Sequence, residues 1–203
     1  MSHLKTIKSA LISVYYKDNL EALARYLAGN NVTLFSTGGT QAYLEDLGIP
    51  VVSVSSLTNF PEILNGRVKT LHPTIFGGIL HRRESPSDLE AISDHQIPAI
   101  DLVIVDLYPF EETVKNTQNE EEIIEKIDIG RISLIRGAAK NYDDVVIVPA
   151  QRYYAHLLNI LTSQVGESTI EQRRELAREA FNVSSHYDGK IYSYFLGEEP
   201  GSL

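Results

Sequence analysis

The residues Asp-Leu-Val-Ile-Val-Asp-Leu at positions 101–107 form a nearly continuous apolar run. A run of this kind, without polar alternation, is typical of a strand that is covered on both faces in a parallel sheet. Further apolar runs occupy residues 9–15, 32–35, 49–54 and 145–148. Because the first three of these alternate with helical patterns, the chain begins as β-α-β-α-β. This order predicts parallel strands joined by right-handed crossovers.

The segments between the strands carry the start and stop signals of helices. Asp18, with Glu21 three residues later, is expected to cap a helix that runs through Ala28. Further helices are expected up to about Gly48, from Ser87 to about His95, from Asn119 to Ile127, through Arg136 and Lys140, and over 153–161, 168–185 and 191–196. No linker, repeat or low-complexity tract divides the chain. We therefore expect one three-layer α/β/α domain over residues 1–203, with its core at about 8–196, a mostly parallel central sheet and additional C-terminal helices.

The composition excludes several classes of protein. The chain has 203 residues and a net charge of −9, and since nucleic-acid-binding domains are usually basic, no nucleic-acid partner is expected. Without Cys it forms neither a disulfide nor a thiolate metal site, and its six His lack the spacing of metal ligands. No signal peptide or membrane-spanning run is recognised, so we expect a cytoplasmic protein with no membrane partner.

One segment concentrates residues that bind anions. Between Gly66 and Gly78 the chain places Arg67, Lys69 and His72 within a few positions of one another. Glycine allows the backbone to approach a ligand closely, and Arg and Lys supply positive charge. The segment therefore predicts an anion site, although a surface loop with ordinary solvated cations fits the same residues.

A second anion-binding signal lies where the strand at 32–35 leads into a helix. Ser36-Thr37-Gly38-Gly39-Thr40 supplies free backbone amides, hydroxyls and the positive end of a helix dipole, all of which favour a phosphate. The loop lacks the Lys of a P-loop, and a plain tight turn is the alternative. Lys17 stands at the start of the preceding helix, where a cation is unfavourable unless it serves a ligand or reaches into water.

The remaining polar candidates follow the strands at their carboxyl ends. Tyr108 follows the strand at 101–107, and Asp128 precedes a helix that contains Lys140. Because ligands bind at this edge in open α/β folds, we expect these side chains to meet Lys69 and the phosphate loop. The alternatives are a core aromatic for Tyr108, an N-cap for Asp128 and a last-turn cation for Lys140. The set suits proton transfer and oxyanion stabilisation on a phosphorylated small molecule, without a cofactor or a metal.

Five motifs together resemble the inosine monophosphate (IMP) cyclohydrolase domain family. They are Ser-Thr-Gly-Gly-Thr (36–40), Asn-Phe-Pro-Glu-Ile-Leu-Asn-Gly-Arg-Val-Lys-Thr-Leu-His-Pro (59–73), Asp-Leu-Tyr-Pro-Phe-Glu-Glu-Thr-Val (106–114), Ile-Asp-Ile-Gly (127–130) and Ala-Ala-Lys-Asn (138–141). The resemblance extends from about Lys8 to Phe195 in the same order, and the segment 59–73 is its most specific part. It implies a methylglyoxal-synthase-like fold and a homodimer.

The resemblance also implies a reaction and the residues that serve it. The substrate would be 5-formamidoimidazole-4-carboxamide ribonucleotide (FAICAR), whose carboxamide nitrogen attacks the formyl carbon; loss of water then gives IMP, the last step of purine synthesis. The residues at catalytic positions are Lys69, Tyr108, Asp128 and Lys140. The residues at substrate-binding positions are Ser13, Lys17, Ser36, Thr37, Gly38, Gly39, Arg67, Thr70, Asp106 and Gly130. No cofactor and no metal are implied.

The sequence departs from the family pattern near these positions. Tyr15 and Tyr16 stand where Ser-Asp is usual, and Asp106 stands where Asn is common. Arg131 replaces a second glycine, and Gly137 replaces an alanine. A side chain at position 131 is expected either to reach the phosphate or to crowd the pocket.

Three other hypotheses stay open. A nucleotide-sensing regulatory module of the same fold needs only the phosphate loop, and the joint presence of Lys69, Tyr108, Asp128 and Lys140 argues against it. Methylglyoxal synthase chemistry suits the fold but not the segment 59–73. The larger formyl-transferring domain of the bifunctional enzyme is not among these residues. The chain is therefore expected to be either a free-standing cyclohydrolase or a truncated N-terminal half.

Overall fold

The computed structural model of this chain describes residues 4–64 and 68–197. Its strands are β1 (Lys5–Thr6), β2 (Ser9–Ser13), β3 (Thr33–Ser36), β4 (Val52–Ser53), β5 (Leu102–Val105), β6 (Val146–Val148) and β7 (Glu167–Ser168). Its helices are α1 (Leu20–Gly29), α2 (Gly38–Asp46), α3 (Val54–Thr58), α4 (Pro73–Leu80), α5 (Pro86–Asp94), α6 (Phe110–Asn116), α7 (Glu120–Glu125), α8 (Gly130–Lys140), the 3₁₀ turn η2 (Gln151–Tyr153), α9 (Tyr154–Ser163) and α10 (Ile170–Leu196).

Within these residues, five strands form one parallel sheet in the order β4-β3-β2-β5-β6. The central strand β2 pairs with β3 and β5, so that Leu11 lies opposite Phe35 on one side and Val103 on the other. β1 and β7 form a separate antiparallel pair. The predicted α/β class and parallel central sheet are confirmed.

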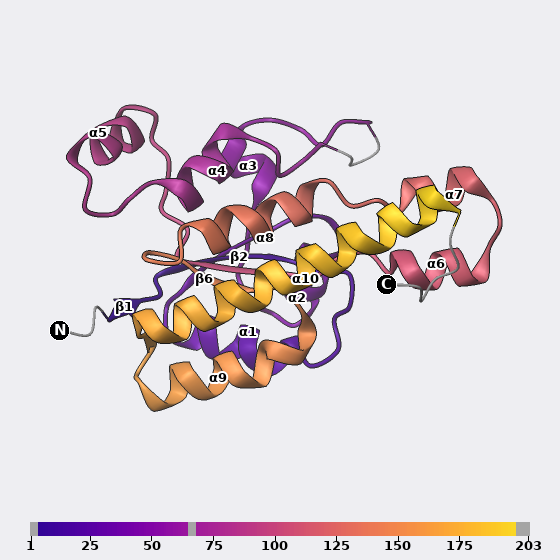
Figure 1. The fold of residues 1–203 in the computed structure, drawn as a ribbon. Helices are drawn as coiled ribbons and strands as arrows, with labels where there is room; N and C mark the ends of the chain where they lie inside the picture. The colour runs from indigo at the N-terminus through magenta and orange to yellow at the C-terminus, as the bar shows by residue number, and fades with distance from the viewer. Residues whose placement is uncertain (1–3, 65–67, 198–203) are drawn as a thin grey trace.

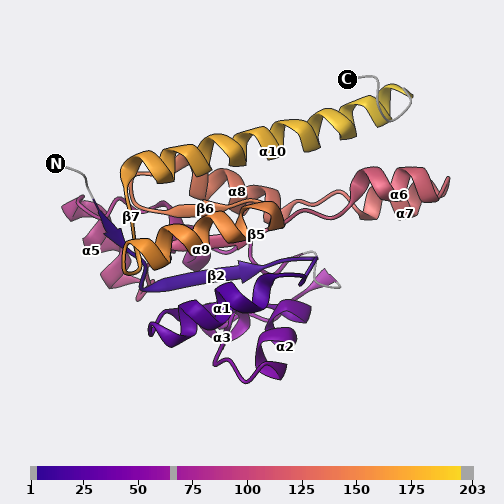
Figure 2. The ribbon, with the colours of Figure 1, turned by 90° about the horizontal axis from the view of Figure 1, so that it is seen from below.

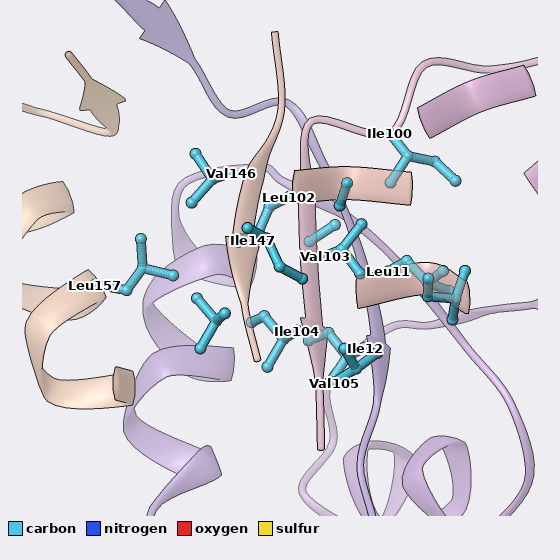
Figure 3. Packing of buried hydrophobic residues seen from close by; sticks show 14 of the residues in the cluster. Leu11, Ile12, Ile100, Leu102, Val103, Ile104, Val105, Val146, Ile147 and Leu157 are labelled. Atoms are coloured by element: carbon cyan, nitrogen blue, oxygen red, sulfur yellow. The ribbon is translucent and has the colours of Figure 1, made fainter. Parts of the chain in front are cut away.

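The core surrounds the central strands because their side chains are apolar on both faces. All four residues of β5 are fully buried, as are Leu11 and Ile12 of β2. Figure 3 shows these side chains together with Val146 and Ile147 of β6 and Leu157 of α9. Full burial of one such side chain contributes about 1.5–3 kcal/mol, so this region anchors the strand ends that carry the polar candidates.

Helices cover both faces of the sheet and complete the predicted three layers. α8 packs against β5 and β6 on one face with α4 beside it, and α1 and α9 lie on the other face (Figure 1). The long helix α10 packs along α8 and β6, and it thereby shields an edge strand that would otherwise be free to pair. Over the described ranges, no helix is long and apolar enough to cross a membrane.

Two short helices project from the body of the molecule. α6 and α7 lie beside the C-terminal part of α10, away from the sheet (Figure 2). A small second core joins them to α10 through Phe110, Ile123 and Tyr187, and the rings of Phe110 and Tyr187 meet edge to face at 6.2 Å. This extension takes the chain out from the end of β5 and returns it to the start of α8.

Three local features at the starts of helices differ from the sequence prediction. Asn19, not Asp18, precedes α1, and it adopts a left-handed φ of 61° without a side-chain capping bond. The strand expected over 49–54 is limited to β4, because the Ser53 side chain caps α3 immediately afterwards. Ser85 caps α5, two residues before the predicted cap.

The second half of the segment predicted to bind anions is a helix. The His72 ring caps α4 by accepting a hydrogen bond from the Thr74 amide at 3.2 Å, and Pro73 follows in the first turn. Gly78 is therefore a helix residue and not the end of an anion-binding loop. A Cβ at Gly78 would lie 2.6 Å from the Pro98 carbonyl oxygen and 3.1 Å from the Ile100 side chain. The glycine is required because α4 passes this close to the chain that leads into β5.

Gly78→Ala is expected to destabilise the protein by about 1–3 kcal/mol, because the added methyl group overlaps a backbone carbonyl. Gly189→Ala in α10 is the matched control: its Cβ would meet nothing within 4 Å, so this exchange is expected to stabilise by about 0.5–1 kcal/mol. Urea unfolding measures both free energies. Equal shifts in the two variants would contradict the close packing at Gly78.

Candidate active site

The polar candidates gather where the strand order reverses. From the central strand β2, the chain proceeds through β3 and β4 in one direction, whereas β5 and β6 lie on the opposite side of β2. Loops leaving β2 and β5 therefore diverge and open a crevice at the carboxyl edge. Ser13 ends β2 at this crevice, and Asp106 directly follows β5.

A cavity of about 490 Å³ occupies this edge. It is lined by Ser13, Lys69, Thr70, Tyr108, Ile124, Glu125, Lys126, Ile127, Asp128, Ile129, Gly130 and Arg131. Three of the four predicted catalytic residues, Lys69, Tyr108 and Asp128, thus share one cavity although they come from three separate loops. The sequence prediction that these three meet agrees with the structure.

Asp128 is held in a defined position by the elements on either side of it. Its Oδ1 accepts a hydrogen bond from the Arg131 amide at 2.7 Å, so it caps the first turn of α8. The Tyr187 hydroxyl of α10 accepts from the Asp128 amide at 2.8 Å and donates to the Lys126 carbonyl at 2.9 Å. Burial raises the pKa of Asp128, while the Arg131 charge and amide act in the opposite direction. The other oxygen, Oδ2, is buried and has no hydrogen-bond partner among the described residues.

Arg131 belongs to the cavity although the family positions did not include it. Its guanidinium lies 4.6 Å from the Tyr108 ring centroid, and its Nε donates to the Ser13 hydroxyl at 3.4 Å. One terminal nitrogen lies 3.8 Å from Asp128 Oδ2. A side chain at 131 is expected from the sequence either to reach the phosphate or to crowd the pocket. In the structure Arg131 neither contacts the phosphate loop nor fills the pocket. The signal in the sequence was its position directly after Gly130, at the start of α8.

The predicted phosphate loop forms the N-terminus of α2. Thr37 precedes the helix in extended conformation and makes no side-chain capping bond, so the first amides of the helix have no partner within it. Gly38 has φ of +52°, a conformation that favours glycine. Ideal Cβ atoms on Gly38 and Gly39 would lie 3.7 Å from Lys69 Nζ and 3.9 Å from Lys17 Nζ. Two ammonium groups and a helix N-terminus therefore converge on one point, which suits an anion.

Lys17 is fixed beside this point by backbone groups. Its ammonium donates to the carbonyls of Val14 at 3.1 Å and Tyr15 at 2.7 Å. Burial and the charge of Arg131 lower the pKa of Lys17, and Asp106 acts in the opposite direction. An added anion would favour the charged ammonium. The Thr37 hydroxyl donates to the Glu62 carboxylate, and a phosphate bound through Thr37 would have to displace this contact.

Two predicted substrate-binding residues serve the scaffold instead. Ser36 is fully buried, and its hydroxyl donates to the Ile12 carbonyl at 2.7 Å, so it ties β3 to β2. The Asp106 carboxylate accepts the amides of Tyr15 and Tyr16, so it holds the loop after β2. Burial raises the pKa of Asp106 against these hydrogen bonds. Both side chains therefore have a positioning role in this structure, and their direct contact with a ligand stays a prediction.

Lys140 does not lie in the cavity. It is the last residue of α8 and is exposed, whereas Asp128 precedes the first turn of the same helix. Ten residues at 1.5 Å each separate the two helix ends by about 15 Å. The expectation that Lys140 meets Lys69 and the phosphate loop at the carboxyl edge is therefore wrong for this chain, and Arg131 is the cation that lies beside Asp128.

The other predicted ligand-binding residues fall into two groups. Thr70 is buried at the cavity, and its hydroxyl would lie 3.2 Å from a Cβ on Gly130, so these two residues pack the 68–70 segment against α8. Arg67 lies outside the described residues.

A further hollow of about 670 Å³ runs along α1 past Lys17 and Arg25. Since it lacks Tyr108 and Asp128, the chemistry is assigned to the smaller cavity.

Comparison with known proteins agrees with the fold of this chain. Residues 19–133 match the family model described as MGS-like domain, and residues 138–202 match the one described as AICARFT/IMPCHase bienzyme. The crystal structure of ForH superposes with a TM-score of 0.81 at 34% identity, covering 94% of this chain and 100% of that one.

Curated relatives carry the name bifunctional purine biosynthesis protein PurH. The protein from Bacteroides thetaiotaomicron is 55% identical over 195 residues, and the one from Rhodospirillum rubrum is 46% identical over 198 residues. These matches cover 96% and 98% of this chain but 38% of each relative. The chain thus spans about two fifths of the length of the curated relatives that it matches.

Tyr187→Phe is expected to lower the free energy of unfolding by about 1–3 kcal/mol, because it leaves the buried Asp128 amide without its acceptor. Tyr192→Phe is the matched control on the same helix, since Tyr192 is 61% exposed, and it is expected to change stability by less than about 0.5 kcal/mol. Urea titrations measure both. A Tyr187→Phe variant as stable as the control would show that the hydroxyl does not hold the 126–128 segment.

Asp128→Asn tests the raised pKa of this carboxyl. A carboxyl whose pKa is raised by folding stabilises the folded state at low pH, and this contribution is lost as pH rises through the folded-state value. The parent should therefore lose stability relative to Asp128→Asn as the pH rises above about 4, measured by urea unfolding at each pH. Asp18→Asn, at an exposed position, controls for the loss of one charge. The opposite trend would mean that the Arg131 ion pair outweighs burial.

Proposed function

Since this chain belongs to the MGS-like domain family and is similar to the N-terminal, IMP cyclohydrolase region of bifunctional PurH proteins, we propose that it is an IMP cyclohydrolase. The reaction closes the second ring of FAICAR with loss of water and gives IMP. One observation carries the proposal: Lys69 lines the cavity that holds Tyr108 and Asp128, and its ammonium also lies beside Gly38 in the phosphate loop. A single side chain thus links the anion site with the site of chemistry.

The 5′-phosphate of the substrate would bind at the N-terminus of α2. The ammonium groups of Lys69 and Lys17 lie beside Gly38 and Gly39, the first amides of the helix would donate to the phosphate, and Thr37 would add its hydroxyl on leaving Glu62. A bound phosphate places the base of the nucleotide toward the carboxyl ends of β2 and β5, where the cavity lies. Thr70 and Gly130 would form part of the wall of this cavity.

The ring closure would proceed by proton transfers between groups on the cavity wall. The carboxamide nitrogen forms a bond to the formyl carbon and gives a proton to Asp128, and the formyl oxygen becomes a hydroxyl group. This hydroxyl then leaves, so that one hydrogen of the carboxamide, one of the formamide nitrogen and the formyl oxygen depart as one water molecule. The raised pKa of Asp128 makes it a better base than an ordinary carboxylate. Lys69 and Tyr108 would stabilise the oxygen and protonate it.

Positioning supplies much of the rate in such a reaction. The carboxamide and the formamide are on neighbouring ring carbons. Holding the carboxamide nitrogen in line with the formyl carbon therefore removes most of the entropic cost of reaching the reactive geometry. The fixed position of Asp128, set by Tyr187 and the α8 amide, matches this requirement. Lys140 is left out of the proposed mechanism because it lies at the far end of α8.

We also propose a cytoplasmic homodimer. Support for the dimer comes from large apolar side chains on the C-terminal part of α10, where Tyr192, Phe195 and Leu196 are each more than half exposed. Light scattering on the purified chain measures the mass directly, and a monomer at working concentration would contradict this proposal.

Lys69→Met is expected to reduce turnover of FAICAR by at least about 100-fold while the protein stays folded, because it removes an acid from the cavity and a cation from the phosphate loop. Lys115→Met, an exposed lysine at the end of α6, is the matched control and should keep full activity. The assay follows the ultraviolet absorbance of the closed purine ring.

Two further measurements, of IMP binding and of phosphate release, separate the competing functions. Binding of IMP by the parent without turnover of FAICAR would favour a nucleotide-sensing module. Release of phosphate from dihydroxyacetone phosphate would favour methylglyoxal synthase chemistry. Equal turnover by the parent and Lys69→Met would remove Lys69 from the mechanism.

A further inference from the structure

Two polar atoms of residues that line the cavity are buried and adjacent, and they share only a long ion pair. Asp128 Oδ2 and one terminal guanidinium nitrogen of Arg131, Nη1, have no hydrogen-bond partner among the described residues. They lie 3.8 Å apart, and their side chains are 4% and 12% exposed. Leaving such groups unpaired is costly in a folded protein. The arrangement therefore indicates a ligand that supplies what both atoms lack.

The two atoms have opposite requirements. A carboxylate oxygen only accepts hydrogen bonds, and a guanidinium nitrogen only donates them. The complementary ligand carries a donor and an acceptor on neighbouring atoms, as a primary carboxamide does with its N–H and C=O. A carboxylate ligand would repel Asp128, and an amidine or amine would repel Arg131.

We propose that Arg131 is a substrate-binding residue that donates through Nη1 to the carboxamide oxygen of FAICAR while Asp128 Oδ2 accepts from the carboxamide nitrogen. This inference rests on the proposed cyclohydrolase function and assigns the site that recognises the reacting amide. In IMP the same pair would meet the ring carbonyl and the adjacent ring N–H.

Arg131 is held in place by contacts that leave Nη1 without a hydrogen-bond partner among the described residues. Its Nε donates to the Ser13 hydroxyl at 3.4 Å, and its guanidinium lies 4.6 Å from the centroid of the Tyr108 ring. These contacts come from the ends of β2 and β5, the two strands that diverge at the crevice. An arginine fixed in this way loses little further freedom when it binds a planar ligand.

The proposed hydrogen bond from Arg131 to the amide oxygen also favours the ring closure. A hydrogen bond to the amide oxygen withdraws electron density from the nitrogen and makes its proton more acidic. Asp128 accepts that proton through the oxygen adjacent to Arg131. The amide is thereby oriented with its nitrogen toward the base, and no additional reactant is needed.

Nucleotide selectivity tests the pair directly. AMP presents an amino group and an unprotonated ring nitrogen at the positions where IMP presents a carbonyl and an N–H, so both contacts are reversed. The parent is expected to bind IMP at least about 10-fold more tightly than AMP, measured by calorimetry, with ribose 5-phosphate as the probe of the phosphate loop alone. A parent that binds AMP as tightly as IMP overturns the inference without any variant.

Variants then assign the selectivity to Arg131. Arg131→Met should reduce the preference for IMP over AMP to less than about threefold, and because Arg131 also adds positive charge near Lys17, it should weaken ribose 5-phosphate binding, but less than it weakens IMP binding. Arg131→Lys, which keeps the charge but not the planar fork, should keep part of the preference. Arg136→Met is the matched control: it lies on the same helix, is exposed and stacks on Phe181 at 5.8 Å. It should behave as the parent.

Turnover distinguishes failure of this inference from failure of the proposed function. If the parent closes FAICAR and Arg131→Met keeps both its kcat/KM and its preference for IMP, Arg131 has no role in binding the substrate. If the parent binds IMP selectively through Arg131 but never closes FAICAR, the cyclohydrolase proposal fails and the binding assignment stands. Should Arg131→Met not fold, Arg131→Lys with an unchanged preference overturns the assignment.

Discussion

The carboxylate of Asp128 is the group on which the arrangement of the site depends. It is almost completely buried, and a buried carboxylate is tolerated only where hydrogen bonds and an opposite charge compensate for the lost water. The Arg131 amide and guanidinium provide that compensation, and the Tyr187 hydroxyl fixes the backbone beside it. These contacts join the start of α8, the return of the α6–α7 extension and the long helix α10 at one point. The long C-terminal helix therefore acts on the site even though it contributes no side chain to the cavity wall.

Positive charge is concentrated at the same edge of an acidic protein. The chain carries a net charge of −9, yet Lys17, Lys69 and Arg131 lie around the ends of the central strands. Lys17 and Arg131 are close enough to lower the pKa of Lys17. Such a cluster is unfavourable in the empty protein and favourable once a dianion is bound. The folded state thus stores repulsion that a phosphorylated ligand would relieve, which is the expected electrostatic character of a binding site.

The sequence predicts the sheet and much of the site, and the misses have identifiable physical causes. Apolar runs identify β2, β3, β5 and β6 because strands covered on both faces cannot alternate in polarity, and the carboxyl-edge rule brings Lys69, Tyr108 and Asp128 together. Lys140 is misplaced because motif matching carries no information on distance, whereas the rise of a helix separates its two ends. The sequence alone does not place the Ser36 hydroxyl, because in a glycine-rich loop it can bond either to a ligand or to a neighbouring strand, and the coordinates show its bond to β2. Residues 65–67, including Arg67, lie outside the described part of the chain.

Four of the five departures from the family pattern, Tyr15, Tyr16, Asp106 and Arg131, lie together in space, whereas Gly137 packs near Phe76 and Ile79. Asp106 brings a negative charge that Arg131 and Lys17 counter, and its carboxylate holds the amides of Tyr15 and Tyr16. The Tyr15 ring then meets Tyr108 edge to face at 5.4 Å, and Arg131 lies 4.6 Å from the same Tyr108 ring. Each change taken alone adds bulk or charge to the cavity. Taken together, the negative charge of Asp106 balances the positive charge of Arg131. The Tyr15 ring packs against Tyr108, which Arg131 also contacts. Arg131 is therefore one part of a compensated group around Tyr108, which explains how a large cation can replace a glycine beside the site without closing it.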